Sequence, residues 1–312
     1  MTETKPSLTS DSDKSDIPQH SWINRRAPAW SRGYLLLARA DRPIGTWLLL
    51  WPCIWSILLA QGNGLSELRL DLILLFALGA MAMRGAGCTY NDIIDRDFDA
   101  KVARTAQRPI PSGEVSVPQA WVFLALQLLV GFAILIQLNT LTIRLGVASL
   151  LLVVSYPYMK RITFWPQAWL GLTFNWGALM GWTAVTGSLD WPAVALYAAS
   201  FFWTLGYDTI YAHQDKEDDA LIGVKSSALA LGPQTLPFVI AMYSLTVVLL
   251  ALAAGLMGLS WVTGALLAVA AIHFTWQAAT LDTEDTNNCL ERFRSNRDVG
   301  FLIAAAMLTV HA

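Results

Sequence analysis

Long apolar runs constrain the fold of this chain more than any other feature of its sequence. Nine runs have roughly the 20 residues that an α-helix needs to cross a bilayer, and 55% of all residues are hydrophobic. The runs cover residues 43–61, 70–91, 116–137, 139–157, 163–187, 190–213, 233–257, 259–280 and 297–312. We therefore expect an all-α integral membrane protein with about nine transmembrane helices.

The basic residues indicate how these helices are oriented. If the N-terminus lies in the cytoplasm, 18 of the 21 lysines and arginines fall in cytoplasmic segments. The other three are Arg69 and Arg144, near the opposite side, and Arg84, inside a run. This excess is the positive-inside pattern, so the sequence predicts an N-terminus in the cytoplasm and a C-terminus outside.

The beginning of the chain differs in composition from the rest. We expect residues 1–30 to form a disordered polar tail and residues 31–312 to form a single transmembrane domain. Residues 1–22 lack the apolar core of a secretory signal, and their four acids disagree with a mitochondrial transit peptide. A bacterial inner (cytoplasmic) membrane is therefore the expected location. The net charge of −2 gives no sign of nucleic-acid binding.

An acid-rich stretch, residues 90–101, follows the second apolar run, and we call it the first acidic segment. Four aspartates fall within eight of its residues. If the helix continues, Asn91, Asp95 and Asp99 share one face, with Asp92 beside them. Stacked carboxylates repel one another unless a cation binds between them. Mg²⁺ is the natural candidate and Mn²⁺ the alternative, because both prefer oxygen ligands.

Basic residues and a tyrosine lie close to the same side of the membrane. The candidates for substrate binding are Lys101, Arg104 and Arg108, after the first acidic segment, and Tyr156, Lys160 and Arg161, at the end of the fourth run. Lysine and arginine bind phosphate well, so acids, metal and bases together predict a diphosphate site. Lys160 and Arg161 have an alternative role, which is to anchor the helix end at the lipid headgroups.

A second acidic segment, residues 207–219, leaves the sixth run as the first segment leaves the second run. The two runs are four apart, so both segments emerge on one side, as in a four-span unit used twice (spans 1–4 and 5–8) before a ninth span. Asp208, Asp215 and Asp219 are its candidate residues. A single segment of this kind fits an ordinary solvated helix end. Two on one side favour a diphosphate held through Mg²⁺.

Arg84 is the basic residue that lies inside an apolar run. It precedes Asn91 by seven residues, which places it on the same helix face about 10 Å deeper. A charge within a span faces an interior cavity by default. We therefore expect Arg84 to bind a carboxylate-bearing acceptor, with Asn91 adding a hydrogen bond. The alternative is an arginine that pairs with a buried acid or with backbone carbonyls.

Both acidic segments resemble the signatures of the UbiA superfamily of membrane prenyltransferases. The first signature is matched by Asn91-Asp92-x-x-Asp95-x-x-x-Asp99 with residues 104–113, and the second by Asp215-x-x-x-Asp219. Three further stretches, residues 39–47, 156–161 and 207–215, are similar to the branch that prenylates 4-hydroxybenzoate in ubiquinone synthesis. The resemblance covers about residues 30–300.

The resemblance implies nine helices around a central cavity that opens to the lipid. It implies that Mg²⁺ is held by Asn91, Asp92, Asp95, Asp99, Asp215 and Asp219. Arg84 and Asn91 would contact the aromatic acid. The substrates would be a polyprenyl diphosphate and 4-hydroxybenzoate.

The expected reaction transfers the prenyl group to the ring carbon ortho to the acceptor hydroxyl. The catalytic candidates are Asp95, Asp99, Asp215 and Asp219, which act on the departing diphosphate through bound metal. Asp208 or Asp215 would orient or deprotonate the phenol.

Other functions remain open alternatives. The same chemistry can act on naphthoate, homogentisate, a chlorin or haem, although Arg84 favours a small benzoic acid. A transporter would place its acids near the bilayer midplane, whereas these acids cluster at one end of the spans. A CDP-alcohol phosphotransferase also uses Asp-rich motifs, but its spaced Asp-Gly and Ala-Arg pattern does not occur in the sequence.

Overall fold

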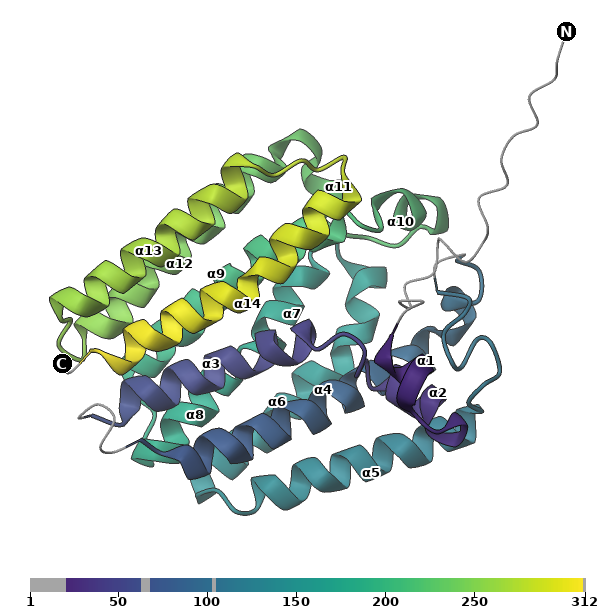
Figure 1. Ribbon diagram of the computed structural model, residues 1–312, viewed down its shortest axis with the longest axis horizontal. Helices are drawn as coiled ribbons and strands as arrows, with labels where there is room; N and C mark the ends of the chain where they lie inside the picture. The colour runs from purple at the N-terminus through teal and green to yellow at the C-terminus, as the bar shows by residue number, and fades with distance from the viewer. Residues whose placement is uncertain (1–20, 63–67, 103–104, 311–312) are drawn as a thin grey trace, which may run out of the picture. The chain divides into compact units, whose positions relative to one another are not determined.

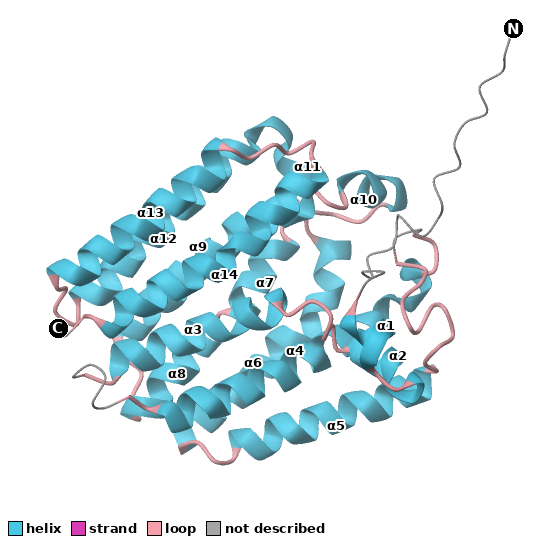
Figure 2. Cartoon of the chain, viewed as in Figure 1, coloured by secondary structure: helices cyan, strands magenta, loops and turns pink. Residues whose placement is uncertain are grey.

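The computed structural model describes residues 21–62, 68–102 and 105–310. Every regular element in these ranges is a helix, as Figure 2 shows, so the expectation of an all-α fold is confirmed. The chain forms two compact units. The N-terminal unit comprises residues 1–43 and 82–130, and the main unit comprises residues 44–81 and 131–312.

Most of the predicted apolar runs coincide with helices to within a few residues (Figure 1). The helices are α1 (Trp22–Arg26), α2 (Ala29–Leu37), α3 (Ile44–Ala60), α4 (Leu70–Asp99), α5 (Val117–Leu135), α6 (Thr140–Ile162), α7 (Pro166–Phe174), α8 (Gly177–Thr186), α9 (Trp191–Ala212), α10 (Lys216–Ile222), α11 (Ser227–Leu231), the 3₁₀ turn η3 (Gly232–Gln234), α12 (Thr235–Gly255), α13 (Trp261–Ala279) and α14 (Thr286–Leu308). Within the described residues, five helical stretches are long and apolar enough to cross a membrane: α4, α5, α6, Ser227–Gly255 and α13. The protein is therefore an all-helical, multi-pass membrane protein.

Helix α1 falls within the stretch to residue 30 that the sequence was expected to leave as a polar tail. The helix forms because the Ser21 hydroxyl accepts a hydrogen bond from the Ile23 amide at 3.2 Å. This contact caps the N-terminus of the helix, and the Ile23 side chain is fully buried. Residues 1–20 of the expected tail lie outside the described residues.

The fifth apolar run forms two short helices, α7 and α8, instead of one continuous helix. The break lies at Asn175, whose Nδ2 donates to the Gly171 carbonyl and to the Thr204 hydroxyl, both at 2.7 Å. Thr204 belongs to α9. The side chain of Asn175 is fully buried. A tertiary contact with the neighbouring helix therefore accompanies this break.

Helix α14 begins at Thr286, well before the apolar run that predicted it at residue 297. The Asp285 carboxylate accepts from the amides of Asn287 and Asn288 at 2.8 and 3.2 Å, which is an N-cap. The first half of the helix is polar, but it buries Phe293 and Asn296. Tertiary packing therefore makes this half helical without an apolar run.

The core of the main unit is built around buried tryptophans. The Trp55 indole on α3 donates to the Gly300 carbonyl on α14 at 2.9 Å. The Trp203 indole on α9 donates to Asn296 Oδ1 at 2.8 Å. Both rings are fully buried. A polar group in a membrane interior must find its partner within the protein, so these two bonds fix α3 and α9 against α14.

Helix α9 also packs closely on α12. Gly206 on α9 faces the ring of Tyr243 on α12, where a Cβ atom would overlap the ring. Glycine is therefore required for this approach of the two helices. In Figure 1, α13 and α14 run side by side along the main unit, and α13 packs on both α12 and α14.

The N-terminal unit has its own apolar core. It is formed by residues from α2, α4, α5 and the connection between α4 and α5: Leu37, Ala86, Ile93, Ile110, Val115, Ala120 and Leu124. The Thr89 hydroxyl on α4 lies 3.1 Å from Gln127 Oε1 on α5. This core supports the last turns of α4, which carry the first acidic segment.

Candidate active site

The first acidic segment is helical up to Asp99, because α4 continues beyond its apolar part. Asn91, Asp95 and Asp99 therefore share one face of α4, as predicted for a helix that continues through this segment. Asp92 and Asp95 are almost fully buried, and Asp99 is 7% exposed. Three buried carboxylates this close together need positive charge nearby.

Two arginines provide positive charge within the N-terminal unit. Arg39 Nη2 lies 2.8 Å from Asp92 Oδ1. Arg108 Nη1 lies 3.3 Å from the same oxygen and 2.9 Å from Asp99 Oδ2. Arg108 was expected to bind substrate phosphate, but in this structure it joins two of the aspartates. Hydrogen bonds of this kind, with both partners charged, are among the stronger ones in proteins.

Arg39 is a site residue that the sequence analysis did not single out. It follows α2 and has a φ of +55°, the one positive φ among the described non-glycine residues. This left-handed conformation costs about 1–2 kcal/mol for a residue with a Cβ. Its Nη1 donates to the Leu36 carbonyl at 2.9 Å while Nη2 reaches Asp92. The one feature of the sequence that pointed to Arg39 was its place in residues 39–47, a stretch that resembles sequences of the family.

The other predicted residues of the N-terminal unit lie on α4 or just after it. Arg84 and Asn91 are half-buried on α4. Lys101 is exposed, and its ammonium lies 6.0 Å from the centre of the Phe98 ring. Arg104 lies outside the described residues. The roles predicted for these residues remain predictions.

The second acidic segment is not a continuous helix. Helix α9 ends at Ala212, and α10 begins at Lys216, with Asp215 as its N-cap residue. The Asp219 amide donates to the Asp215 carbonyl at 2.8 Å, so these two residues are one helical turn apart. Asp208 remains on α9. Asp215 therefore lies in the short connection between α9 and α10, residues 213–215, which we call the corner. The position of Asp215 depends on the contacts that hold this corner.

Three contacts hold this corner within the main unit. The ring of His213 is hydrogen-bonded through Nε2 to the Thr235 hydroxyl at 3.1 Å. The side-chain Nε2 of Gln214 donates to the Thr286 carbonyl. Lys216 Nζ lies 3.2 Å from Glu284 Oε1. The last two contacts reach the connection between α13 and α14 and the start of α14.

The chain after α10 returns to the end of α6. The Lys225 amide donates to the Lys160 carbonyl at 2.9 Å, and Lys225 Nζ donates to the Ile162 carbonyl at 3.1 Å. The Arg161 guanidinium lies 5.8 Å from the centre of the Tyr158 ring. The structure thus joins the end of α6, with Lys160 and Arg161, to the chain that follows the second acidic segment.

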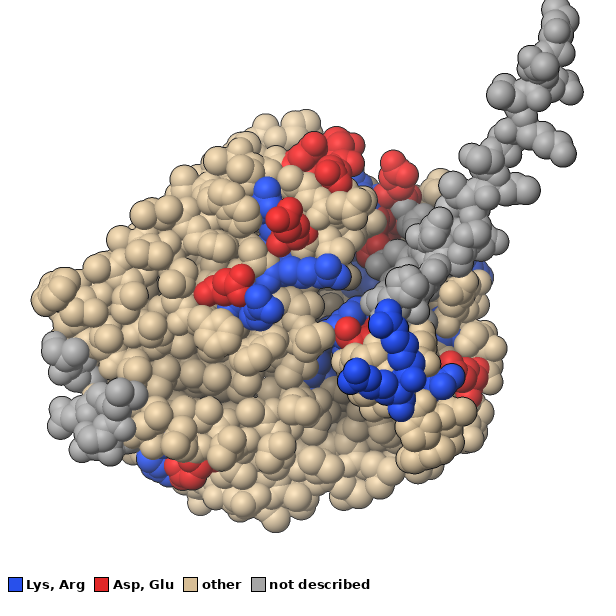
Figure 3. Space-filling model, viewed as in Figure 1, with Lys and Arg blue, Asp and Glu red and all other residues tan. Residues whose placement is uncertain are grey.

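The predicted residues divide between the two units. The N-terminal unit carries Arg84, Asn91, Asp92, Asp95, Asp99, Lys101 and Arg108, and the main unit carries Tyr156, Lys160, Arg161, Asp208, Asp215 and Asp219. On the face that Figure 3 shows, charged side chains form a few groups among mostly uncharged residues. Charge on this face is therefore concentrated in few places, as expected for a membrane protein.

The oxygen ligands of α4 have the chemistry that Mg²⁺ prefers. No three His, Cys, Asp or Glu side chains of the described residues form a complete metal cluster. Mg²⁺ does not need one, because it is usually bound by one or two carboxylates together with waters and substrate phosphates. Asp92 Oδ2 is buried and accepts no hydrogen bond from the described residues. The carboxylates therefore fit a magnesium ion that is shared with a diphosphate.

Comparison with known proteins identifies the class. The model of the UbiA prenyltransferase family matches residues 49–304, so the chain belongs to this family. It is 50% identical over 303 residues to 4-hydroxybenzoate polyprenyltransferase, mitochondrial, of Arabidopsis thaliana, covering 96% of this chain and 74% of that protein. It is 49% identical over 279 residues to the Homo sapiens protein of the same description, covering 89% and 75%.

Solved structures support the same fold. The apo structure of a UbiA homologue from Aeropyrum pernix K1 matches with a TM-score of 0.70 and 28% identity, over 84% of this chain and 96% of that one. A UbiA homologue from Archaeoglobus fulgidus bound to GPP and Mg²⁺ matches with a TM-score of 0.67 and 20% identity, over 89% and 99%. The UbiA fold expected from the sequence is therefore confirmed.

Proposed function

We propose that this protein transfers a polyprenyl group from its diphosphate to the ring carbon ortho to the hydroxyl of 4-hydroxybenzoate, a step of ubiquinone biosynthesis. The observation that carries this function is the 50% identity to a 4-hydroxybenzoate polyprenyltransferase over 96% of the chain. The two acidic segments agree with it, because diphosphate chemistry needs carboxylates that hold a divalent metal.

Asn91, Asp95 and Asp99 on α4 would hold Mg²⁺, as would Asp215 and Asp219 of the second acidic segment, with Mn²⁺ as an alternative metal. The chemistry that the metal supplies when bound is neutralisation of the charge that develops on the departing diphosphate. Asp92 belongs to the same set and is also held by Arg39 and Arg108.

The basic residues bind the phosphates directly. Lys101, Arg104, Lys160 and Arg161 supply the charge that stabilises the pyrophosphate as the allylic C–O bond breaks. Arg108 acts differently, because it pairs with Asp92 and Asp99 and offsets the charge of these buried carboxylates.

The acceptor binds deeper along α4. Arg84 pairs with the carboxylate of 4-hydroxybenzoate, and Asn91 donates a hydrogen bond to the same molecule. Asp208 or Asp215 orients the phenol or accepts its proton. Tyr156 on α6 is a further candidate for substrate binding.

The isoprenoid chain occupies an apolar groove that opens to the bilayer. Each buried CH₂ contributes about 0.8 kcal/mol, so the chain dominates donor affinity. The protein crosses the membrane nine times, with α7 and α8 together as one pass, around a central cavity. Its N-terminus and both acidic segments lie on the cytoplasmic side of a bacterial inner membrane. The excess of Lys and Arg in those segments supports this orientation.

The test is prenyl transfer by purified, detergent-solubilised protein. Geranyl diphosphate and radiolabelled 4-hydroxybenzoate should give product with Mg²⁺ and none with EDTA. Asp95→Asn should abolish turnover, whereas Asp97→Asn, a neighbour with a 76% exposed side chain, should remain active. An active Asp95→Asn variant would remove the metal assignment. Lack of product with 4-hydroxybenzoate, but product with naphthoate or homogentisate, would change the acceptor.

A further inference from the structure

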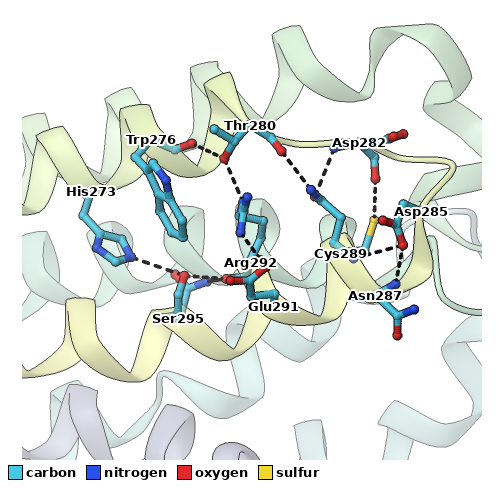
Figure 4. A network of polar contacts seen from close by, with 12 residues as sticks. His273, Trp276, Thr280, Asp282, Asp285, Asn287, Cys289, Glu291, Arg292 and Ser295 are labelled. Atoms are coloured by element: carbon cyan, nitrogen blue, oxygen red, sulfur yellow. Dashed lines mark hydrogen bonds and ion pairs between the residues drawn. The ribbon is translucent and has the colours of Figure 1, made fainter.

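The connection between α13 and α14, residues 280–285, is a tightly closed loop (Figure 4). Asn288 holds its first half: Nδ2 donates to the Thr280 carbonyl at 3.0 Å, and Oδ1 accepts from the Asp282 backbone amide at 3.1 Å. The Asp285 carboxylate caps α14 by accepting from Asn287 and Asn288 amides. Hydrogen bonds therefore fix the loop at its beginning, through Thr280, and at its end, through Asp285.

A buried arginine of α14, Arg292, holds the beginning of the loop in place. Arg292 is 7% exposed, and its Nε donates to the Thr280 hydroxyl at 2.8 Å. Its guanidinium stacks 4.2 Å from the centre of the Trp276 ring. Figure 4 shows Arg292 of α14 beside the ring of Trp276 of α13 and bonded to Thr280, so the loop is attached to both helices that it connects. Such a loop is a rigid support for anything that binds to it.

The corner of the second acidic segment binds to this support on both sides of Asp215. The residue before it, Gln214, donates to the Thr286 carbonyl. The residue after it, Lys216, lies 3.2 Å from Glu284. These contacts join positions 68 and 72 residues apart in the chain. They hold the side chains of the two residues that flank Asp215 in the sequence, at a place where α9 has ended and α10 has not yet begun.

We propose that the loop 280–285 and the first residue of α14, Thr286, position Asp215 for metal binding, with Gln214, Lys216 and Glu284 as positioning residues. The inference rests on the proposed function, in which Asp215 is a ligand of Mg²⁺. Glu284 has a second effect through charge. It holds the Lys216 ammonium, a cation that otherwise competes with the metal for neighbouring carboxylates such as Asp215 and Asp219.

The test is a double-mutant cycle on the contact between Lys216 and Glu284. Glu284→Gln should raise the Mg²⁺ concentration for half-maximal activity about two- to fivefold, the range for an exposed ion pair. The kcat at saturating Mg²⁺ should stay unchanged. Lys216→Gln with Glu284→Gln should require no more Mg²⁺ than Lys216→Gln alone, because the two residues act as one pair. Asp298→Asn is the matched control, since this exposed acid on α14 pairs with Arg297.

Direct metal binding gives a second readout. Mn²⁺ alone is titrated into each variant, and the loss of the free-ion signal in electron paramagnetic resonance measures its affinity. Glu284→Gln should weaken Mn²⁺ binding, and Asp298→Asn should not. If Glu284→Gln and Asp298→Asn match the wild type in both measurements, the positioning role is overturned. A loss of kcat and of thermal stability with unchanged metal affinity would overturn it as well.

The wild-type protein separates this inference from the function on which it rests. Wild-type protein without Mg²⁺-dependent transfer overturns the proposed function, and the positioning role with it. Mg²⁺-dependent wild-type activity together with an unchanged metal requirement in Glu284→Gln overturns the positioning role alone.

Discussion

Replacing Arg108 by methionine tests how the first acidic segment is held together. Arg108 donates to Asp99 at 2.9 Å and to Asp92 at 3.3 Å. The side chains of the three residues are at most 13% exposed. Breaking a buried ion pair by removing one partner costs about 3–5 kcal/mol, because the remaining charge stays buried. Two charge-assisted hydrogen bonds at about 1.5–3 kcal/mol each give a similar figure.

The expected result is a large loss of thermal stability. For a protein of this size, each kcal/mol lowers Tm by about 2–4 °C, so Arg108→Met should unfold about 6–20 °C below the wild type. The assay is intrinsic tryptophan fluorescence during heating in detergent without Mg²⁺. Arg96→Met is the matched control, because this 43% exposed arginine makes a 3.5 Å surface pair with Asp97.

A second substitution isolates the charge effect. Adding Asp99→Asn to Arg108→Met removes one of the buried charges and should recover part of the lost Tm. Equal Tm values for Arg108→Met and Arg96→Met would refute the reasoning. A double variant less stable than Arg108→Met would show that the buried charge is not what destabilises the protein.

Three further outcomes are expected. Arg84→Ala should raise the KM for 4-hydroxybenzoate with little change in the KM for the donor; an unchanged acceptor KM would exclude its role. Gly206→Ala should destabilise by about 1–3 kcal/mol, since the methyl group meets the ring of Tyr243, whereas Gly264→Ala, on α13 with open space around it, should be neutral or stabilising by up to about 1 kcal/mol. Burial and the nearby acids raise the pKa of the Cys289 thiol to about 11, so a maleimide at pH 8 should label it only after unfolding; rapid labelling of native protein would contradict this.

The helices could be predicted from the sequence wherever hydrophobicity alone decides the structure. The apolar runs located α3 and α12 to within about two residues, because a bilayer selects length and apolar composition. The polar first half of α14 was missed for the same reason. It contains no apolar run, and its helix depends on the Asp285 cap and on burial of Phe293 and Asn296.

Helical periodicity predicted the part of the candidate site that lies on a single helix. Spacing alone placed Asn91, Asp95 and Asp99 on one face of α4, because the helix continues. It did not indicate that Arg39 pairs with Asp92, since 53 residues separate them. The corner that carries Asp215 was also hidden, because its contacts come from a loop near the other end of the chain.

The break between α7 and α8 has a consequence for how the chain enters the membrane. The two helices have 9 and 10 residues, or about 14 and 15 Å at 1.5 Å per residue. Neither half crosses a hydrocarbon layer of about 30 Å by itself. The buried Nδ2 of Asn175 between them donates to the Thr204 hydroxyl of α9. During synthesis, this segment should therefore remain at the translocon until α9 has emerged from the ribosome, and the two should enter the lipid as a pair.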